Sequence, residues 1–416
     1  MIPKHFWLYL EPYIIINMFQ KSVLLYNTIN GAKLLYESDN QRVFSLIKSL
    51  KQNNYVIKVS AVQIKKKEIK KFVTKVKSNF FGDIIDSSSV KTKPFIFSPI
   101  LSIQKDKNIM KHDKVLLGHG AKAFINEITF YLNSNLNTTL SLYNNAYKQF
   151  PCLISDKSND ELSYKLILSE LEYLINGSLK TINICGGEIL YYSNLTQLVD
   201  KLNELPQIKK YYLHISKLQK ATKFINSLSN NSKVIIIIDS KSLLEEKEIL
   251  LKGIINSDNL LFQVIVSNEN DLEIIDKVEA KYPDIASKVL PYWSGKNIIF
   301  FRKNVFTNKT NLHNSKPSQV EIFQKMEINT LNFGKVTVLN NRKLYTNLNR
   351  LALGEFGKKN LAEMVQKELK SKNLWFLTRE YVNPCRSCIY NILCPSISNY
   401  EIEANKYNMC TVTELF

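Results

Sequence analysis

The sequence has few cysteines and no hydrophobic run long enough to cross a membrane. A membrane helix needs about 18 or more apolar residues, whereas apolar runs here, such as residues 234–238, have the length of a buried strand. Glu11 and Pro12 interrupt the apolar N-terminus, and no small-residue cleavage site follows, so no secretory signal is expected. Six cysteines in 416 residues are too few for a secreted disulfide scaffold. These absences predict a cytoplasmic protein with no membrane partner.

Acidic residues are in the minority. The chain has 56 Lys and Arg against 37 Asp and Glu, a formal net charge of +19. Such a charge suits an anionic partner, such as nucleic acid, an anionic lipid surface or an acidic peptide. However, the basic residues are scattered along a chain rich in Lys, Asn and Ile, which favours a compositional bias. The densest basic stretch, residues 65–71, is interpreted as a solvated helix face. There is no P-loop, G-x-G-x-x-G or G-x-S-x-G sequence.

Periodicity predicts an α/β protein of two or three domains. Strands at residues 6–10, 13–16, 22–28, 32–36 and 56–63 and helices at 43–50 and 65–77 predict a small α+β unit. This unit is interpreted as a winged-helix-like module or, alternatively, a plain N-terminal cap. Residues 86–93 are polar and Ser-rich and predict a linker.

Beyond the linker, strands alternate with helices. Strands are predicted at residues 125–132, 181–185, 211–215, 234–238, 261–266 and 297–302, and helices at 162–175, 195–202, 218–228, 243–254 and 271–281. Apolar strands in repeated βα units predict a parallel sheet with helices outside, as an open sheet or a complete or partial barrel. Residues 334–345 predict a hairpin, and a helix and a cysteine-rich tail follow it.

The strongest chemical signal is this tail, where four of the six cysteines gather. Cys385 and Cys388 form a C-x2-C pair, Cys394 follows after five residues, and Cys410 after fifteen more. Four thiolates at such spacing are the ligand set of a tetrahedral Zn²⁺ or of an iron–sulfur cluster. Metal binding would help to fold a segment that otherwise has little apolar periodicity. Spacing alone leaves zinc and iron–sulfur both open.

A second signal is Gly186-Gly187-Glu188, which comes between a predicted strand and a helix. Glycines there let the backbone approach a ligand, and the carboxylate could accept a hydrogen bond from an amino group. An ordinary strand-to-loop turn is the alternative. Cys152 and Cys185 are isolated and are interpreted as buried small side chains.

Taken together, the Gly-Gly-Glu sequence, the hairpin and the C-x2-C-x5-C tail resemble the radical SAM peptide maturases that end in a SPASM domain. The resemblance is closest to cluster-lacking pseudo-radical-SAM proteins of bacterial systems that modify ribosomally made peptides, and to SPASM maturases paired with an ATP-grasp ligase. Residues 6–12, 25–28 and 394–401 resemble the two ends of these proteins, so the resemblance spans nearly the whole chain.

The resemblance implies a protein that has lost the S-adenosylmethionine-cleaving cluster. The family holds that cluster with C-x3-C-x2-C, but residues 133–151 contain no cysteine. Gly186, Gly187 and Glu188 match the family's motif for binding the cosubstrate's amino group, with Ile189 in place of the usual proline. This motif is interpreted as a relic, and we expect no S-adenosylmethionine cofactor.

The resemblance also implies that the tail keeps one of the two auxiliary clusters of a SPASM domain. The cysteines of one cluster are absent, and Ser398 stands where one of them would be. Cys385, Cys388, Cys394 and Cys410 match the complete ligand set of the other, which favours one [4Fe–4S] cluster over zinc.

The resemblance divides the chain into a peptide-recognition-like module (residues 1–90), a degenerate radical-SAM-like βα barrel (91–325) and a truncated SPASM domain (326–416). It implies a protein that helps to mature a ribosomally made peptide, as a peptide-binding scaffold or an electron relay, beside an active radical SAM or ATP-grasp enzyme. One alternative is a non-radical peptide-modifying enzyme that uses Glu188 and Cys185 in the former cosubstrate cleft. A second is a zinc-containing nucleic-acid-binding protein, which the absence of aromatic-interleaved basic stretches disfavours.

Overall fold

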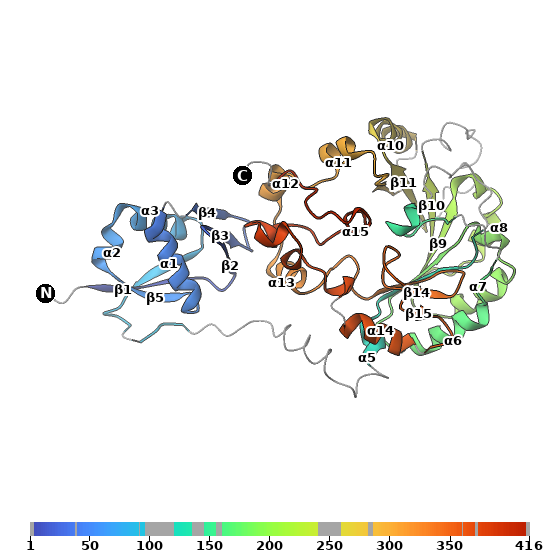
Figure 1. Ribbon diagram of the computed structural model, residues 1–416, viewed down its shortest axis with the longest axis horizontal. Coiled ribbons are helices and arrows are strands. Elements are labelled where there is room, and N and C mark those ends of the chain that lie inside the picture. The colour runs from blue at the N-terminus through green and yellow to red at the C-terminus, as the bar shows by residue number, and fades with distance from the viewer. Residues whose placement is uncertain are drawn as a thin grey trace.

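The computed structural model describes residues 4–37, 40–90, 92–95, 120–134, 145–154, 160–239, 259–281, 286–359, 361–370 and 373–412. An N-terminal module lies at the left of Figure 1, and a large sheet with its helices lies at the right. Helices α12 (Lys309–Asn314) and α13 (Gln319–Glu327) and part of the cysteine-rich tail lie between them. The predicted helix at residues 243–254 falls outside the described residues.

The N-terminal module contains two small antiparallel sheets. In the first, β1 (His5–Leu10) lies between β5 (Val56–Ser60) and β6 (Gly82–Asp86). Helices α1 (Gln41–Gln52), α2 (Ala61–Lys65) and α3 (Lys67–Ser78) accompany this sheet, and Leu8, Val43 and Phe72 share its core. The α+β content is therefore confirmed, whereas the winged-helix likeness stays a prediction. Strand β6 is absent from the predicted elements, and it takes the first residue of the predicted linker.

The second sheet is the meander β2 (Ile14–Phe19), β3 (Ser22–Asn27) and β4 (Lys33–Glu37). Successive side chains of β3 point to opposite faces, as strand geometry requires. Leu25 packs into the core of the module, and Leu24 and Tyr26 pack against Ile392 and Leu393 of the C-terminal tail. The Asn17 amide also donates to the Ile389 carbonyl, at 2.8 Å. The meander thus joins the module to the rest of the chain.

The large sheet has the strand order β12–β11–β10–β9–β8–β7–β13–β14–β15. Its strands β7 to β13 are mutually parallel, whereas β14 pairs antiparallel with both β13 and β15. The bounds are β7 (Glu127–Tyr131), β8 (Thr181–Cys185), β9 (Ile208–His214), β10 (Ser232–Ile238), β11 (Leu260–Val266), β12 (Ser287–Pro291), β13 (Lys335–Val338), β14 (Lys343–Tyr345) and β15 (Gly354–Glu355). Because β12 and β15 pair with no further strand among the described residues, the sheet does not close, and the expectation of a complete barrel is wrong.

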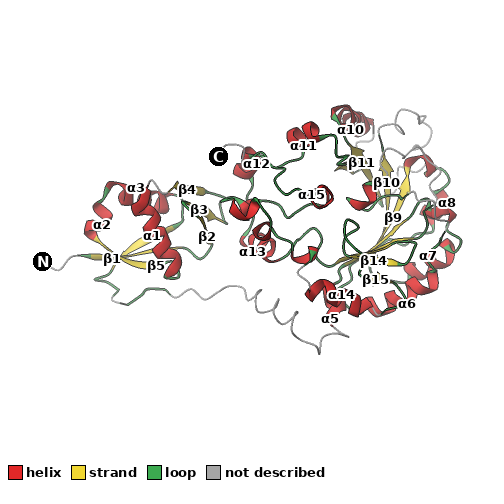
Figure 2. Cartoon of the chain, in the orientation of Figure 1, coloured by secondary structure: helices red, strands yellow, loops and turns green. Residues whose placement is uncertain are grey.

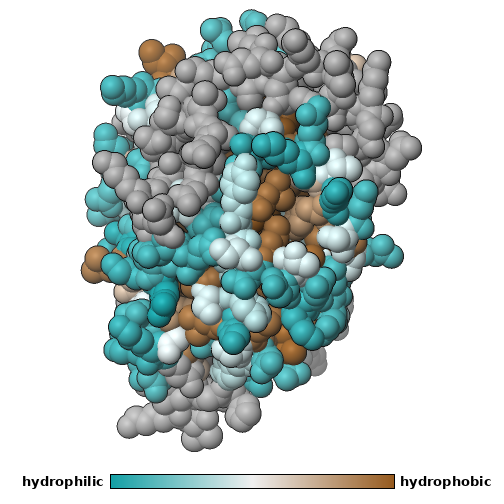
Figure 3. All heavy atoms as spheres, turned by 90° about the vertical axis from the view of Figure 1, so that its right-hand side faces the viewer, coloured by the Kyte–Doolittle hydropathy of each residue, from teal (hydrophilic) through white to brown (hydrophobic). Residues whose placement is uncertain are grey.

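Helices cover one face of the large sheet, here called its outer face, as Figure 2 shows. These are α6 (Tyr164–Leu174), α7 (Leu195–Asn203), α8 (Thr222–Asn226) and α14 (Leu361–Lys370). The opposite, inner face carries a separate apolar cluster that includes Tyr131, Cys185, Tyr212 and Ile235. Figure 3 looks at the side of the molecule where α7 and α8 lie, and hydrophilic side chains surround a narrow strip of hydrophobic ones there.

One predicted strand is wrong. Residues 297–302 do not form a strand, because α11 (Ile298–Asn304) occupies them. Phe300 and Phe301 are buried on one side of this helix, whereas Ile299 is exposed. An apolar run of four residues fits a helix as well as a strand, and the edge position is taken by β12, whose exposed Lys288 and Val289 give it little apolar signal. In the part of the chain that the structure describes, no helix is both long and apolar enough to cross a bilayer.

Candidate functional site

The four tail cysteines come from short turns around one small helix. Cys385 opens η10 (Cys385–Ser387), Cys388 ends that turn, Cys394 follows η11 (Asn391–Leu393), and Cys410 lies beyond α15 (Asn399–Ala404). Cys385 is buried and the other three are partly exposed. Within the described residues, no three His, Cys, Asp or Glu side chains are arranged as a ready metal site. The turns therefore gather the thiols into one region without closing them around an ion.

The thiols nevertheless lie close enough to influence one another. Burial raises the pKa of Cys394 to about 12. Arg379 acts in the opposite direction and lowers this pKa, whereas the nearby Cys388, Cys385 and Cys410 raise it further. Burial likewise raises the pKa of Cys385 and Cys388. As free thiols these groups are protonated at neutral pH, so a metal would have to displace their protons.

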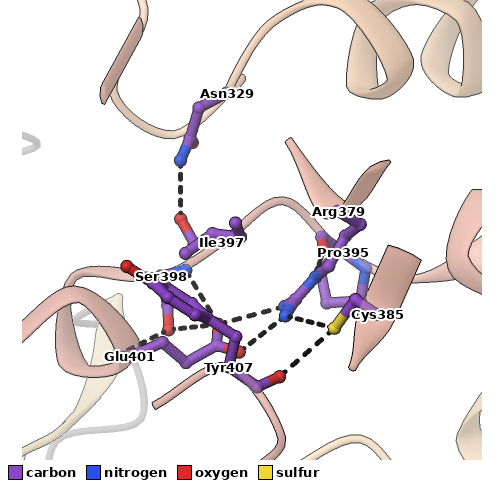
Figure 4. A network of polar contacts seen from close by, with 8 residues as sticks. All are labelled: Asn329, Arg379, Cys385, Pro395, Ile397, Ser398, Glu401 and Tyr407. Carbon is purple, nitrogen blue, oxygen red and sulfur yellow. Dashed lines mark hydrogen bonds and ion pairs between the residues drawn. The ribbon is translucent and has the colours of Figure 1, made fainter. Parts of the chain in front are cut away.

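Arg379 lies beside this region in a buried ion pair with Glu401. Arg379 Nη1 and Nη2 contact the two Glu401 carboxylate oxygens at 2.6 and 3.0 Å (Figure 4). The same Nη1 donates to Cys385 Sγ at 3.6 Å, and this thiol donates to the Tyr407 carbonyl at 3.2 Å. Burial lowers the pKa of Arg379, but the adjacent Glu401 carboxylate raises it by more, so the pKa of Arg379 is raised overall. A buried cation therefore lies next to the Cys385 sulfur.

Ser398, at the position of an expected family cysteine, is an N-terminal helix cap. Its hydroxyl accepts from the Glu401 backbone N–H at 3.4 Å, and its own backbone N–H donates to Glu401 Oε2 at 2.9 Å, which completes a capping box on α15. The same Glu401 carboxylate thus caps the helix and holds Arg379.

The residue types fit a metal centre. Four thiolates are the soft ligands that zinc and iron–sulfur clusters select. Cys385, Cys388, Cys394 and Cys410 would hold the group, and a cluster with four protein ligands would supply electron transfer or structural stability. Arg379 would offset part of the negative charge of the thiolates.

The Gly-Gly-Glu loop follows β8 and is held by Asn133, which follows β7. The Gly187 N–H lies 2.9 Å from Asn133 Oδ1 and 3.0 Å from the Asn133 carbonyl, and Asn133 Nδ2 donates to the Glu188 carbonyl at 3.0 Å. A Cβ on Gly186 would approach Asn133 Oδ1 to 2.6 Å. A side chain of the protein itself therefore makes the close approach for which glycine is needed.

Glu188 is paired within the protein. Its carboxylate is 3% exposed, and Lys217 Nζ lies 3.1 Å from Oε2, with the Lys217 side chain 15% exposed. No directed hydrogen bond reaches either Glu188 carboxylate oxygen from the described residues, so the contact is an ion pair. An internal ammonium group therefore stands beside the carboxylate that the resemblance assigns to an external amino group.

The neighbouring strand ends carry a second buried pair. His214 ends β9, and its Nε2 lies 3.0 Å from Oδ2 of Asp239, which follows β10. Cys185, by contrast, is fully buried, and burial raises its pKa well above the ordinary value. A protonated thiol inside an apolar cluster has little nucleophilic character. This geometry disfavours the proposed enzymatic role for Cys185.

Sequence reasoning missed Asn133, Lys217, His214 and Asp239. Each except Lys217 stands at or just after the carboxyl end of a parallel strand, where polar side chains of α/β proteins gather. That position was a usable signal for three of them. Lys217, in η6 (Ile215–Lys217), was not distinguishable from the many other lysines of this chain.

The chain matches no protein-family model. A solved structure of SuiB from Streptococcus suis, bound to its precursor peptide SuiA, covers 97% of this chain and 100% of that one, with a TM-score of 0.52 and 13% identity. SuiB bound to S-adenosylmethionine gives the same coverage and identity with a TM-score of 0.49. At 13% identity the likeness to the peptide complex shows a shared fold.

A curated relative, autophagy-related protein 11 of Vanderwaltozyma polyspora, is 24% identical over 284 residues. The match covers 61% of this chain and spans 22% of the relative's length.

Proposed function

We propose that this protein binds a ribosomally made precursor peptide and helps its maturation as a scaffold or electron relay, without cleaving S-adenosylmethionine itself. The observation that carries the proposal is an open strand edge beside a groove in the N-terminal module. The shared fold with SuiB, which has been solved in complex with its precursor peptide, supports it.

The open edge belongs to β5, whose paired neighbour in the described sheet is β1. The Leu10 N–H donates to the Tyr55 carbonyl, and the Ala61 N–H donates to the Lys4 carbonyl. In an antiparallel pair, every second residue of a strand points its N–H and C=O toward the partner strand. The backbone groups of Ile57 and Val59 therefore point toward β1. The same alternation turns the N–H and C=O of Lys58 outward. An extended peptide could pair with them by strand addition.

The groove beside this edge has room for a peptide and carries positive charge. A cavity of about 420 Å³ lies between β5 and α1, lined among others by Trp7, Ser49, Lys58 and Lys93. A second cavity of about 390 Å³ shares Leu46, Ser49 and Gln63 with the first and extends along α1 to Arg42 and Lys66. Four basic residues line the two cavities, namely Arg42, Lys58, Lys66 and Lys93. The nearby acid Glu68 pairs with Arg42, so positive charge is in excess and favours an acidic peptide.

The test is the affinity of the full chain for the precursor peptide encoded beside it, measured by fluorescence anisotropy. Lys58→Pro removes the outward N–H and leaves the β1 pairing intact, since proline is tolerated at strand edges. We expect about tenfold weaker binding, the equivalent of one lost hydrogen bond. Lys58→Ala, which keeps the N–H, is the control and should bind within about threefold of wild type. Failure of the wild type to bind the precursor would overturn the proposal.

A cluster in the tail belongs to the same proposal. The absence of C-x3-C-x2-C and the Glu188–Lys217 pair both argue against radical generation by this chain. A cluster held by four cysteines would have no open iron, so electron transfer or structural support would be its role.

A further inference from the structure

The inner face of the large sheet carries a polar row near the amino ends of its strands. Strand register aligns Thr337 with Thr129, Thr129 with Asn183, Asn183 with Lys210, and Lys210 with Lys233. The next row toward the carboxyl ends is apolar and belongs to the inner cluster of Tyr131, Cys185, Tyr212 and Ile235. The polar row is therefore separated by a packed layer from Glu188 and His214, which lie at the carboxyl ends of the strands.

Cationic charge dominates this row. Among the described residues, neither Lys210 nor Lys233 has a hydrogen bond or an ion pair. In the described part of the chain, the acid that acts on Lys210 is Glu127, which is already engaged: its Oε2 lies 3.4 Å from Lys335 Nζ, and its Oε1 accepts from Asn183 Nδ2 at 2.7 Å. Burial lowers the pKa of Lys210. Glu127 raises this pKa, whereas the positive charges of Lys335, Lys288 and Lys233 lower it further. The partly buried Lys210 and the exposed Lys233 thus occupy adjacent positions on neighbouring strands, with no partner among the described residues.

Asn183 supplies a second, independent feature of this row. Its side chain is fully buried, and its amide nitrogen donates to Glu127 Oε1 and to Thr129 Oγ1, at 2.7 and 3.0 Å. Because an ionised carboxylate can only accept, these bonds fix the orientation of the amide. Asn183 Oδ1 is then a buried acceptor that no donor from the described residues reaches. Such an atom costs free energy unless a donor reaches it.

The row also adjoins an empty space. A cavity of about 90 Å³ is lined by Glu127, Thr129, Lys335 and Thr337 of the inner face and by residues of the C-terminal region, such as Asn347. Glu127 and Thr129, the two bonding partners of the Asn183 amide, form part of the wall of this cavity, whereas Asn183 and the two lysines lie behind that wall.

We propose that this row binds an acidic residue of an extended peptide, with Lys210 and Lys233 contacting its carboxylate and Asn183 Oδ1 accepting a peptide N–H. The combination of unpaired cations and an unpaired acceptor selects a ligand with both a carboxylate and an N–H group. This inference rests on the proposed function, because it assigns a second contact for the same peptide. A free oxyanion such as inorganic phosphate shares the anionic chemistry but lacks the N–H donor.

The test uses the full chain and a fluorescein-labelled Gly-Glu-Gly-Glu-Gly amide, with the Gln version of this peptide for comparison. The double variant Lys210→Met/Lys233→Met should bind the Glu probe about tenfold more weakly than wild type. Lys220→Met/Lys223→Met removes the same charge from exposed positions at α8 and should leave the affinity unchanged. Glu127→Gln should tighten binding about threefold, because it removes the competing carboxylate and frees Lys335. Damage to the fold would not produce this gain.

Equal losses in the two double variants would overturn the proposal, as would equal affinities for the Glu and Gln probes. Displacement of the probe by inorganic phosphate at the same concentration would assign the site to a free oxyanion and also overturn it. The precursor peptide is measured in parallel. If it binds in a Lys58-dependent manner while the acidic probe does not bind, this inference fails and the proposed function stands.

Discussion

At the scale of single residues, Lys217 determines what the Gly-Gly-Glu motif can do. A buried carboxylate is costly unless a cation accompanies it, and here that cation is Lys217, 3.1 Å away. In the family that the motif resembles, the carboxylate serves a ligand. In this chain Glu188 and Lys217 satisfy each other's charge, and Asn133 fills the space that the glycines leave.

This pair predicts an asymmetric effect of substitution. Lys217→Met should lower the free energy of unfolding by about 3 kcal/mol, because it leaves the Glu188 carboxylate buried without a cation. Lys217→Met/Glu188→Met should cost less than about 1 kcal/mol, since two apolar side chains of similar length replace the pair. Urea unfolding followed by circular dichroism measures both. A double variant as unstable as the single one would show that Lys217 acts through packing and not through charge.

At the scale of elements, the tail consists of short turns that bury only small apolar clusters. Turns η10 and η11 contribute Cys385, Ile392 and Leu393 to two small apolar clusters, and the Arg379–Glu401 pair ties η9 (Arg379–Tyr381) to α15. Short turns with so small an apolar core are the kind of structure that metal binding stabilises.

The cluster hypothesis predicts about four irons and four sulfides per chain in protein purified without oxygen. Cys388→Ala should lose them, whereas Cys152→Ala, which removes a buried thiol outside the tail, should keep them. Iron, sulfide and zinc analysis decides the matter. One zinc and no iron would replace the cluster with a structural metal, and about eight irons would mean a second cluster.

At the scale of the whole molecule, the β2–β3–β4 meander connects the proposed peptide-binding module to the tail. Leu24 packs with Ile392, Leu393 and the partly buried Cys394, while its neighbour Leu25 packs inside the module. The Tyr26 hydroxyl donates to the Pro317 carbonyl at 2.8 Å, next to α13. Strand β3 therefore packs on one face against the module that contains the proposed peptide groove, and on the other face against the tail that contains the candidate metal centre.

Leu24 and Leu25 form a matched pair for testing this connection. Each change to alanine should cost about 2–5 kcal/mol, because both side chains are buried. Leu24→Ala should raise amide hydrogen exchange in η11 and α13 while α1 and α3 stay protected, whereas Leu25→Ala should raise it in α1 and α3. Identical exchange patterns in the two variants would show that the module and the tail unfold as one unit.

The sequence by itself determined most of the parallel sheet. Strand β8 has the predicted bounds, and β10 and β11 differ from theirs by one or two residues, because strands buried on both faces are apolar runs that periodicity detects. Edge strands β6 and β12 escaped detection since partial exposure removes that signal. The Cys385, Cys388, Cys394 and Cys410 set was visible from spacing alone, whereas its metal stays a prediction.

Only the tertiary structure decided which side chains meet. Lys217 reaches Glu188 because β8 and β9 are adjacent and parallel, and Lys210 lies beside Asn183 and Lys233 because the strand register aligns them. Neither contact leaves a mark in local periodicity, since the partners are far apart in the chain. Local sequence fixes the elements through burial and backbone preference, whereas electrostatic partners depend on register between strands.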